Sequence, residues 1–191
     1  MYKEKIAELK AQIAKNKNVN IDELTIPESM KTEPYINIGT ACYEQGVELS
    51  DNVTSKYGIE YTEIMGVAID KNGRDLAWTG HEFKFEDVAG YRLATRGVGY
   101  DDFGHKFRTA EPVKQGGKPV ILSPKEFGDF IQEAARKVQE IDQSYVKKVE
   151  KEREVMKDVV QSHVGQHGKM GKVEKVYKLA KAKLKSSSLG E

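Results

Sequence analysis

The apolar residues of this chain recur at helical spacing near both ends and at shorter spacing in the middle. Close to the N-terminus, Ile6, Leu9 and Ile13 are separated by three and four residues, with lysines and glutamates between them. This spacing predicts an amphipathic helix over residues 2–16, which is too short to be stable alone in water. Together with the proline-containing connector that follows, this helix forms a first segment, residues 1–34.

The middle segment, residues 35–122, is predicted to be a globular body built around a β-hairpin. The dipeptide Asn72-Gly73 suits the positive φ angles of a two-residue type I′ turn, and apolar-rich stretches flank it. In the register of such a turn, Val67 faces Trp78 across the hairpin. A longer turn stays open as an alternative, because the two-residue register also sets two aspartates opposite each other.

Five further pieces are expected around this hairpin. Residues 35–42 alternate like a strand, followed by an irregular or short helical piece up to residue 58. Residues 86–95 are predicted to form a short helix, and the glycine-rich and charged residues 97–118 a long loop, either functional or disordered. The apolar run at 119–122 predicts a short buried strand. The predicted fold class is therefore α+β: a small antiparallel, hairpin-based sheet with flanking helices.

A long helix is predicted over residues 123–164. Ser123 can cap its start, Pro124 suits the first turn, and Glu126 can complete a capping box. The apolar positions that follow recur at spacings of 4-3-4-3-4, the heptad rhythm of a coiled coil, which slips near the charged run around residue 150. The positions of this predicted seam, expected to contact a partner helix, are Phe127, Ile131, Ala134, Val138, Ile141, Tyr145, Met156 and Val160.

The length of this helix has a consequence for its surroundings. About forty residues make roughly 60 Å of helix, whereas the preceding ~120 residues make a globule about 30–35 Å across. The body therefore cannot cover the whole helix. Three arrangements stay open: the helix pairs with another subunit, folds back on the N-terminal helix, or breaks near residue 150.

The near-neutral total charge conceals two opposite halves. The chain has 31 basic and 30 acidic residues, a net charge of +1. Residues 1–112 carry 14 basic and 19 acidic side chains, or −5, and residues 113–191 carry 17 and 11, or +6. The last segment, residues 165–191, is predicted to contain a basic amphipathic helix that is either simply solvated or contacts nucleic acid or an acidic partner. Its candidate contact residues are Lys172, Lys175, Lys178, Lys181, Lys183 and Lys185.

Candidate catalytic groups are few. Asp101, Asp102 and His105 lie close together in the predicted long loop, where acids and a histidine could bind a divalent cation or act as a base. A solvated acidic turn explains the same cluster and is favoured. Cys42, the single cysteine, is expected to be a small buried hydrophobe rather than a nucleophile. The sequence therefore predicts no catalytic residues, no cofactor and no metal site.

Taken together, these patterns favour a non-enzymatic interaction or assembly protein that oligomerises, or docks on another helical protein, through its long helix. One alternative is an accessory protein that contacts nucleic-acid phosphates through the C-terminal lysines. The other, less favoured, is a metal-dependent or acid–base enzyme built on Asp101, Asp102 and His105. The lone cysteine and the charged N-terminus favour a cytoplasmic protein. The combination of an α/β body, a long terminal helix and a lysine-rich tail leaves a component of a virion, such as that of a bacteriophage, open as well. No transmembrane segment is predicted, because no apolar run approaches about 18 residues.

Overall fold

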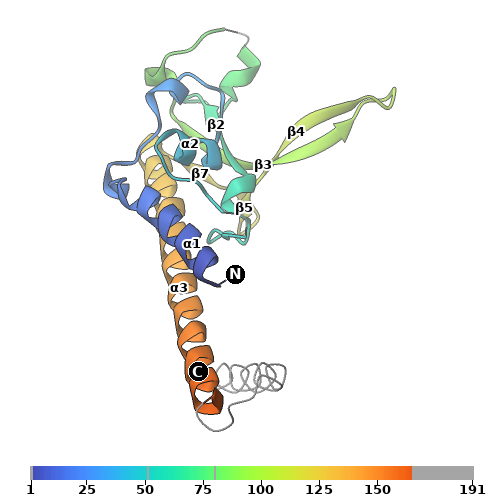
Figure 1. Cartoon of the computed structure of the whole chain (residues 1–191). Helices are drawn as coiled ribbons and strands as arrows, with labels where there is room; N and C mark the ends of the chain where they lie inside the picture. Colours follow the sequence, from blue (N-terminus) through green and yellow to red (C-terminus); the bar gives the residue numbers. More distant parts are fainter. Residues whose placement is uncertain (1, 51, 80, 165–191) are drawn as a thin grey trace. The chain divides into compact units, whose positions relative to one another are not determined.

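The structure of the chain, a computed structural model, describes residues 2–50, 52–79 and 81–164 (Figure 1). It confirms the predicted α+β class, because an open antiparallel sheet is combined with a long helix near the end of the described chain. Within the described residues, no helix is both long and apolar enough to cross a membrane.

Two compact units make up the chain. Residues 14–140 form one, called here the body, and residues 1–13 with 141–191 form the other, called here the helical unit. The α-helices are α1 (Tyr2–Lys17), α2 (Ile38–Glu44) and α3 (Pro124–Val164), and the short 3-10 helices are η1 (Ile21–Glu23), η2 (Glu28–Met30), η3 (Tyr61–Glu63), η4 (Leu76–Thr79) and η5 (Phe85–Asp87).

The main sheet of the body is antiparallel, in the order β1-β2-β3-β4, with β7 also paired to β3. Its central strand is β3, whose residues 90–95 pair with β2 while residues 94–100 pair with β4. Two further short strands form a separate hairpin. The strands are β1 (Tyr35–Asn37), β2 (Ile64–Ile69), β3 (Gly90–Tyr100), β4 (Lys106–Pro112), β5 (Lys114–Gln115), β6 (Lys118–Pro119) and β7 (Ile121–Leu122).

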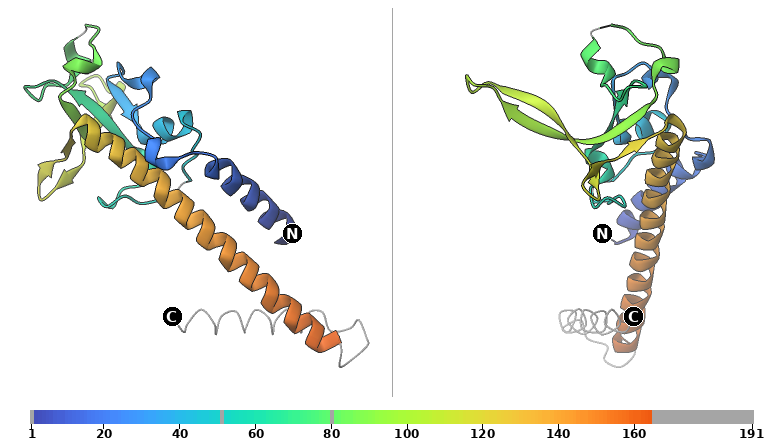
Figure 2. Two further views of the ribbon diagram at one scale, coloured as in Figure 1. Left: turned by 90° about the vertical axis from the view of Figure 1, so that its left-hand side faces the viewer. Right: turned by 180° about the vertical axis from the view of Figure 1, so that it is seen from behind.

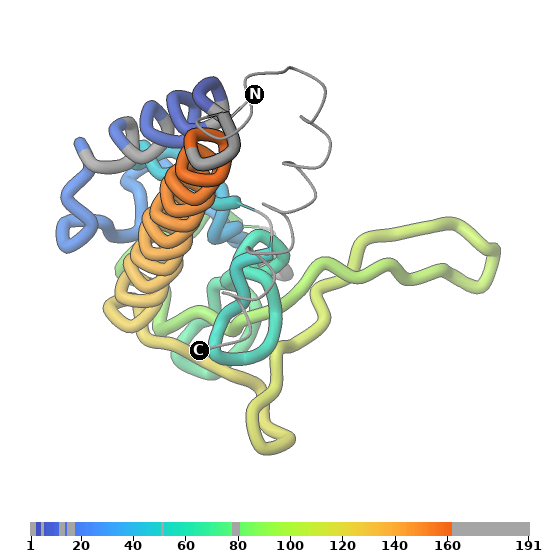
Figure 3. Tube along the Cα trace, turned by 60° about the horizontal axis from the view of Figure 1, so that its bottom comes forward, coloured from blue at the N-terminus to red at the C-terminus, as the bar shows by residue number. Residues whose placement is uncertain are grey.

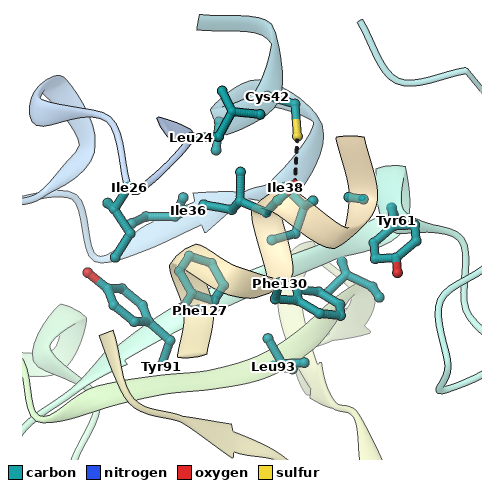
Figure 4. Close-up of a cluster of buried hydrophobic side chains, with 14 of the residues drawn as sticks. Leu24, Ile26, Ile36, Ile38, Cys42, Tyr61, Tyr91, Leu93, Phe127 and Phe130 are labelled. Atoms are coloured by element: carbon teal, nitrogen blue, oxygen red, sulfur yellow. Dashed lines mark hydrogen bonds between the residues drawn. The ribbon is translucent and has the colours of Figure 1, made fainter. Parts of the chain in front are cut away.

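The first turns of α3 pack against the sheet and close the core of the body (Figures 2 and 4). The ring of Phe127 stacks on that of Tyr91 with 4.4 Å between the ring centroids. It also lies over Gly66, where a β-carbon would come within 2.5 Å of the ring. A glycine in a buried strand often marks such a close approach. The position of α3 on the sheet is thus set by a ring that only a glycine can accommodate.

The predicted N-terminal helix and the predicted long helix are confirmed, whereas the strand predicted over residues 35–42 exists only as β1 and residues 38–42 belong to α2. The basic helix predicted within residues 165–191 lies outside the described residues. The amphipathic N-terminal helix is α1, and β1 is followed by the short helix α2. The Ser123 hydroxyl accepts a hydrogen bond from the Glu126 backbone N–H at 3.1 Å, as its capping role requires. The connector is held to α3 by Gln132, whose side-chain amide donates to the Leu24 carbonyl at 2.8 Å.

The predicted reversal of the chain at Asn72-Gly73 is present, but the second strand of the predicted hairpin is not. The carboxylate of Asp70 accepts hydrogen bonds from the backbone N–H groups of Asn72 and Arg74, at 2.8 and 2.9 Å. Gly73 has a φ of 76°, so the loop is the three-residue kind with a left-handed glycine at its end. After a single bridge, the chain turns into η4 instead of forming a second strand.

The partners of β2 are therefore distant in sequence. Val67, which the two-residue turn would place opposite Trp78, pairs with Tyr35 on β1 and Arg92 on β3. A local turn signal predicts only the reversal of the chain. Which strand fills the neighbouring position in the sheet depends on the whole core.

The predicted helix over residues 86–95 and the predicted loop over residues 97–118 are also wrong. After η5 the chain enters β3, and Tyr91 and Leu93, two residues apart, are both fully buried on one face of that strand. The supposed loop consists of two hairpins, β3–β4 and β5–β6. The predicted strand at 119–122 exists as β6 and β7, although Ile121 is half-exposed.

Candidate interaction surfaces

The first half of the predicted seam is internal and cannot contact a partner. Phe127, Ile131, Ala134 and Val138 are at most 1% exposed, because they face the sheet and α2 within the body. Their assignment to an oligomer or partner interface is therefore wrong. The heptad spacing identified the buried face of α3 correctly, but the surface that covers this face belongs to the same chain.

The second half of the seam lies in the helical unit and is partly exposed. Ile141 is 46% exposed, Tyr145 38% and Val160 44%, while Met156 is half-buried. At about 100° per residue, Ile141, Tyr145 and Met156 lie within about 60° of one another around the helix. Of these residues, Ile141 and Met156 define what we call the open stripe of α3.

The side of α3 that adjoins this stripe is covered by α1. Val146 and Val149 on α3 and Ile6 on α1 are buried, and the Lys10 ammonium lies 2.6 Å from a carboxylate oxygen of Glu150. The helix α3 runs through residue 150 without interruption. Of the three arrangements left open by the sequence, the break is therefore excluded, and folding back onto α1 accounts for only part of the apolar surface.

The candidate lysines of the C-terminal segment, Lys172 to Lys185, lie outside the described residues, so their contact with nucleic acid or an acidic partner stays a prediction.

The acidic cluster at residues 101–105 forms the tight turn between β3 and β4. One carboxylate oxygen of Asp101 accepts hydrogen bonds from the backbone N–H groups of Phe103 and His105, at 2.9 and 2.7 Å. The other oxygen lies 3.0 Å from Nδ1 of His105. The pKa of Asp101 is lowered, chiefly by the hydrogen bond from the His105 backbone and further by the His105 side chain and the Phe103 backbone.

This turn has the same construction as the turn at residues 70–74. In each, an aspartate side chain accepts from the backbone N–H groups two and four residues later, and a glycine three residues later has a positive φ. Asp101 and His105 are brought together, whereas within the described turn no hydrogen bond or ion pair joins the side chain of Asp102 to either of them. The arrangement supports a structural turn, since both oxygens of Asp101 are already engaged.

The same turn is the tip of a two-stranded arm, residues 96–110, in which β3 and β4 pair only with each other (Figures 1 and 3). On one face, Phe107 lies opposite Gly99 and Thr109 opposite Gly97. A β-carbon on Gly99 would lie 2.5 Å from the Phe107 ring. These glycines are therefore part of a packed strand surface. In the sequence they indicated a loop, which the structure does not have.

The opposite face of the arm, called here the basic face, was not found from the sequence. Its cross-strand pairs are Arg96 with Ala110, Val98 with Arg108, and Tyr100 with Lys106. All but Ala110 are exposed, with Val98 at 53% and Tyr100 at 66%. The alternation of residues in both strands was the signal that could have revealed this face.

The two remaining candidate reactive or binding positions, the Cys42 thiol and a surface hollow beside α2, are both part of the packing of the body. Cys42 is fully buried, and burial raises the pKa of its thiol to about 12. A surface hollow of about 280 Å³ lies beside α2, but the Asn37 side chain that lines it accepts from the Thr40 N–H to cap that helix. Across the described ranges, no group of three or more histidine, cysteine or acidic side chains is arranged to hold a metal.

Comparison with known proteins gives one partial match. The chain is 35% identical over 89 residues to a 2,3-bisphosphoglycerate-independent phosphoglycerate mutase from Methanoculleus marisnigri. The match covers 46% of this chain and 21% of that protein, so the chain spans about a fifth of its relative's length. No family profile and no solved structure matches the chain.

Proposed function

We propose that this chain is a non-enzymatic interaction or assembly protein that self-associates through the second half of α3. The observation that carries this proposal is the open stripe. One half of α3 is anchored in the core of the body, and in the other half Ile141 is 46% exposed and Met156 is half-buried, beside the residues that are buried with α1. Pairing two such stripes removes apolar surface from water.

The state of the candidate catalytic groups supports a function without catalysis. The carboxylate of Asp101 serves the turn of the arm, and Cys42 is enclosed in the core with a raised pKa. Nucleophiles and bases that act on substrates are found in accessible sites with their reactive atoms available.

Sedimentation velocity at tens of micromolar tests the proposal. The wild-type chain should sediment as a dimer or larger species, and the double variant Ile141→Asp/Met156→Asp as a monomer. Each buried carboxylate should weaken association by at least about 2 kcal/mol, or roughly 30-fold. A matched control, Gln143→Asp, adds a charge at an exposed position about 160° away around the helix and should leave the oligomer intact.

Two results would overturn self-association: a strictly monomeric wild-type chain, or an oligomer that the double variant leaves unchanged while circular dichroism shows it folded. The alternative function, phosphate contact through the lysines of residues 172–185, predicts that removal of residues 169–191 abolishes binding to DNA and RNA. Binding that survives this deletion would refute the alternative.

A further inference from the structure

The basic face of the arm combines a row of cations with an exposed aromatic ring. On this face, each of the three cross-strand pairs contains one cation: Arg96 pairs with Ala110, Arg108 with Val98, and Lys106 with Tyr100. None of these positions is acidic. Side chains on one face of a strand recur about every 7 Å, and diagonal neighbours across a ribbon are about 7–8 Å apart. The three cations therefore form a row about 14 Å long, with an exposed aromatic ring at one end.

The acidic residues of this region lie elsewhere. Glu111 is opposite Thr95, on the face that carries Gly97 and Gly99. The carboxylate of Asp101 is turned into the loop, where it holds two backbone N–H groups. Only Asp102, at the tip, is an exposed acid without a structural task in the turn. The positive charge of the basic face is thus not neutralised along its length.

The net charge of the sequence also changes from negative to positive where the segment with the two hairpins begins. Residues 1–91 carry 10 basic and 16 acidic side chains, or −6, whereas residues 92–118 carry six and three, or +3. A positive ribbon on an otherwise acidic body is a surface that attracts a polyanion and orients it toward one element. An acidic protein could also pair with the positive charges of this face. As a ligand it would not account for the regular spacing of the cations or for the exposed ring of Tyr100 beside Lys106.

We propose that the basic face of the arm binds a nucleic-acid strand. Arg96, Lys106 and Arg108 contact consecutive or near-consecutive phosphates, and Tyr100 stacks on a base. Stacking on an aromatic ring tolerates every base, and phosphate contacts carry no sequence information, so binding is independent of sequence. This site is separate from the open stripe of α3, and the proposal does not depend on self-association.

Fluorescence anisotropy with a labelled 20-nucleotide single strand and with its duplex tests this proposal, using the full chain between 50 and 200 mM salt. Three phosphate contacts contribute about 2–3 to the slope of log affinity against log salt. The variant Arg96→Gln/Lys106→Gln/Arg108→Gln should lose that part of the slope. The matched control Lys71→Gln/Arg74→Gln/Lys84→Gln removes the same charge from exposed positions outside the arm and should keep it.

The variant Tyr100→Ala distinguishes the two forms of the ligand. If an unpaired strand is the ligand, Tyr100→Ala should weaken single-strand binding about 10-fold to 100-fold and leave duplex binding nearly unchanged. Equal, small effects on both probes would identify the duplex as the ligand, with phosphate contact intact.

The proposal is overturned if neither probe binds at 50 mM salt, or if the arm variant and the control lose the same slope. It is likewise overturned if the arm variant binds as the wild type does, since binding would then reside in other lysines. A change in oligomeric state caused by the arm variant, without nucleic-acid binding by the wild type, would make this face a protein interface instead.

Discussion

Replacing Gly66 by alanine should destabilise the body by about 1–3 kcal/mol. The added β-carbon would lie 2.5 and 2.6 Å from two ring carbons of Phe127, well inside the about 3.5–4.0 Å of a normal carbon contact. Relief requires the ring to move by about 1 Å. The ring is fully buried and stacked on Tyr91, so this movement disturbs the contact between α3 and the sheet.

Urea unfolding followed by circular dichroism measures this effect as a lower midpoint with an unchanged slope. A matched control is Gly128→Ala, one residue after Phe127 on α3. There a β-carbon would meet Thr25 at 3.5 Å, an ordinary contact, and alanine is favoured over glycine in a helix by about 0.5–1 kcal/mol. The same change of residue is thus expected to destabilise at Gly66 and to stabilise at Gly128.

A second substitution isolates the cause. In the Gly66→Ala background, Phe127→Leu should cost less than in the wild type, because the smaller side chain removes the clash as well as the packing. The reasoning would be refuted if Gly66→Ala left the free energy of unfolding unchanged, or if the two substitutions were simply additive.

Three further effects are expected. Because the pKa of Asp101 is lowered in the folded chain, its carboxylate should contribute fully to the stability of the turn above its unfolded pKa of about 3.9, and this contribution should be lost as the pH falls through the folded value. NMR of the His105 backbone amide measures this transition, and a midpoint at or above about 3.9 would contradict the expected direction. The Cys42 thiol, with its pKa raised to about 12, should react with a disulfide reagent at pH 8 only after unfolding, so full reaction of the native chain would disprove its burial. Ser123→Ala should lower stability by about 0.5–2 kcal/mol through loss of the cap on Glu126, and a loss below about 0.3 kcal/mol would show that the cap contributes little.

Helices were predictable here because their signals are local. The spacing of apolar residues and the Ser123 cap lie within a few residues of the turns they specify, and both α1 and α3 formed where expected. Strands depended on distant partners. The apolar residues around Tyr91 have a spacing that fits a helix or a strand, and only pairing with β2 selects the strand.

The candidate surfaces show a related limit. Periodicity reveals which face of a helix is apolar, but it does not reveal what covers that face. The half of the seam near Phe127 meets the sheet of its own body, whereas Ile141 remains exposed. The basic face was missed because Gly97 and Gly99 indicated a loop, although they provide room for cross-strand side chains.

The central strand also constrains how the arm could change in length. Because β3 is paired with β2 as far as Thr95, the side to which each arm residue of β3 points is set by the pairing within the core. Adding one residue to each strand of the arm near its base would exchange the basic and glycine faces beyond that point, since side chains alternate. Adding two to each would preserve both faces and lengthen the reach by about 7 Å. Variants of this arm in other chains should therefore differ in length by pairs of residues per strand.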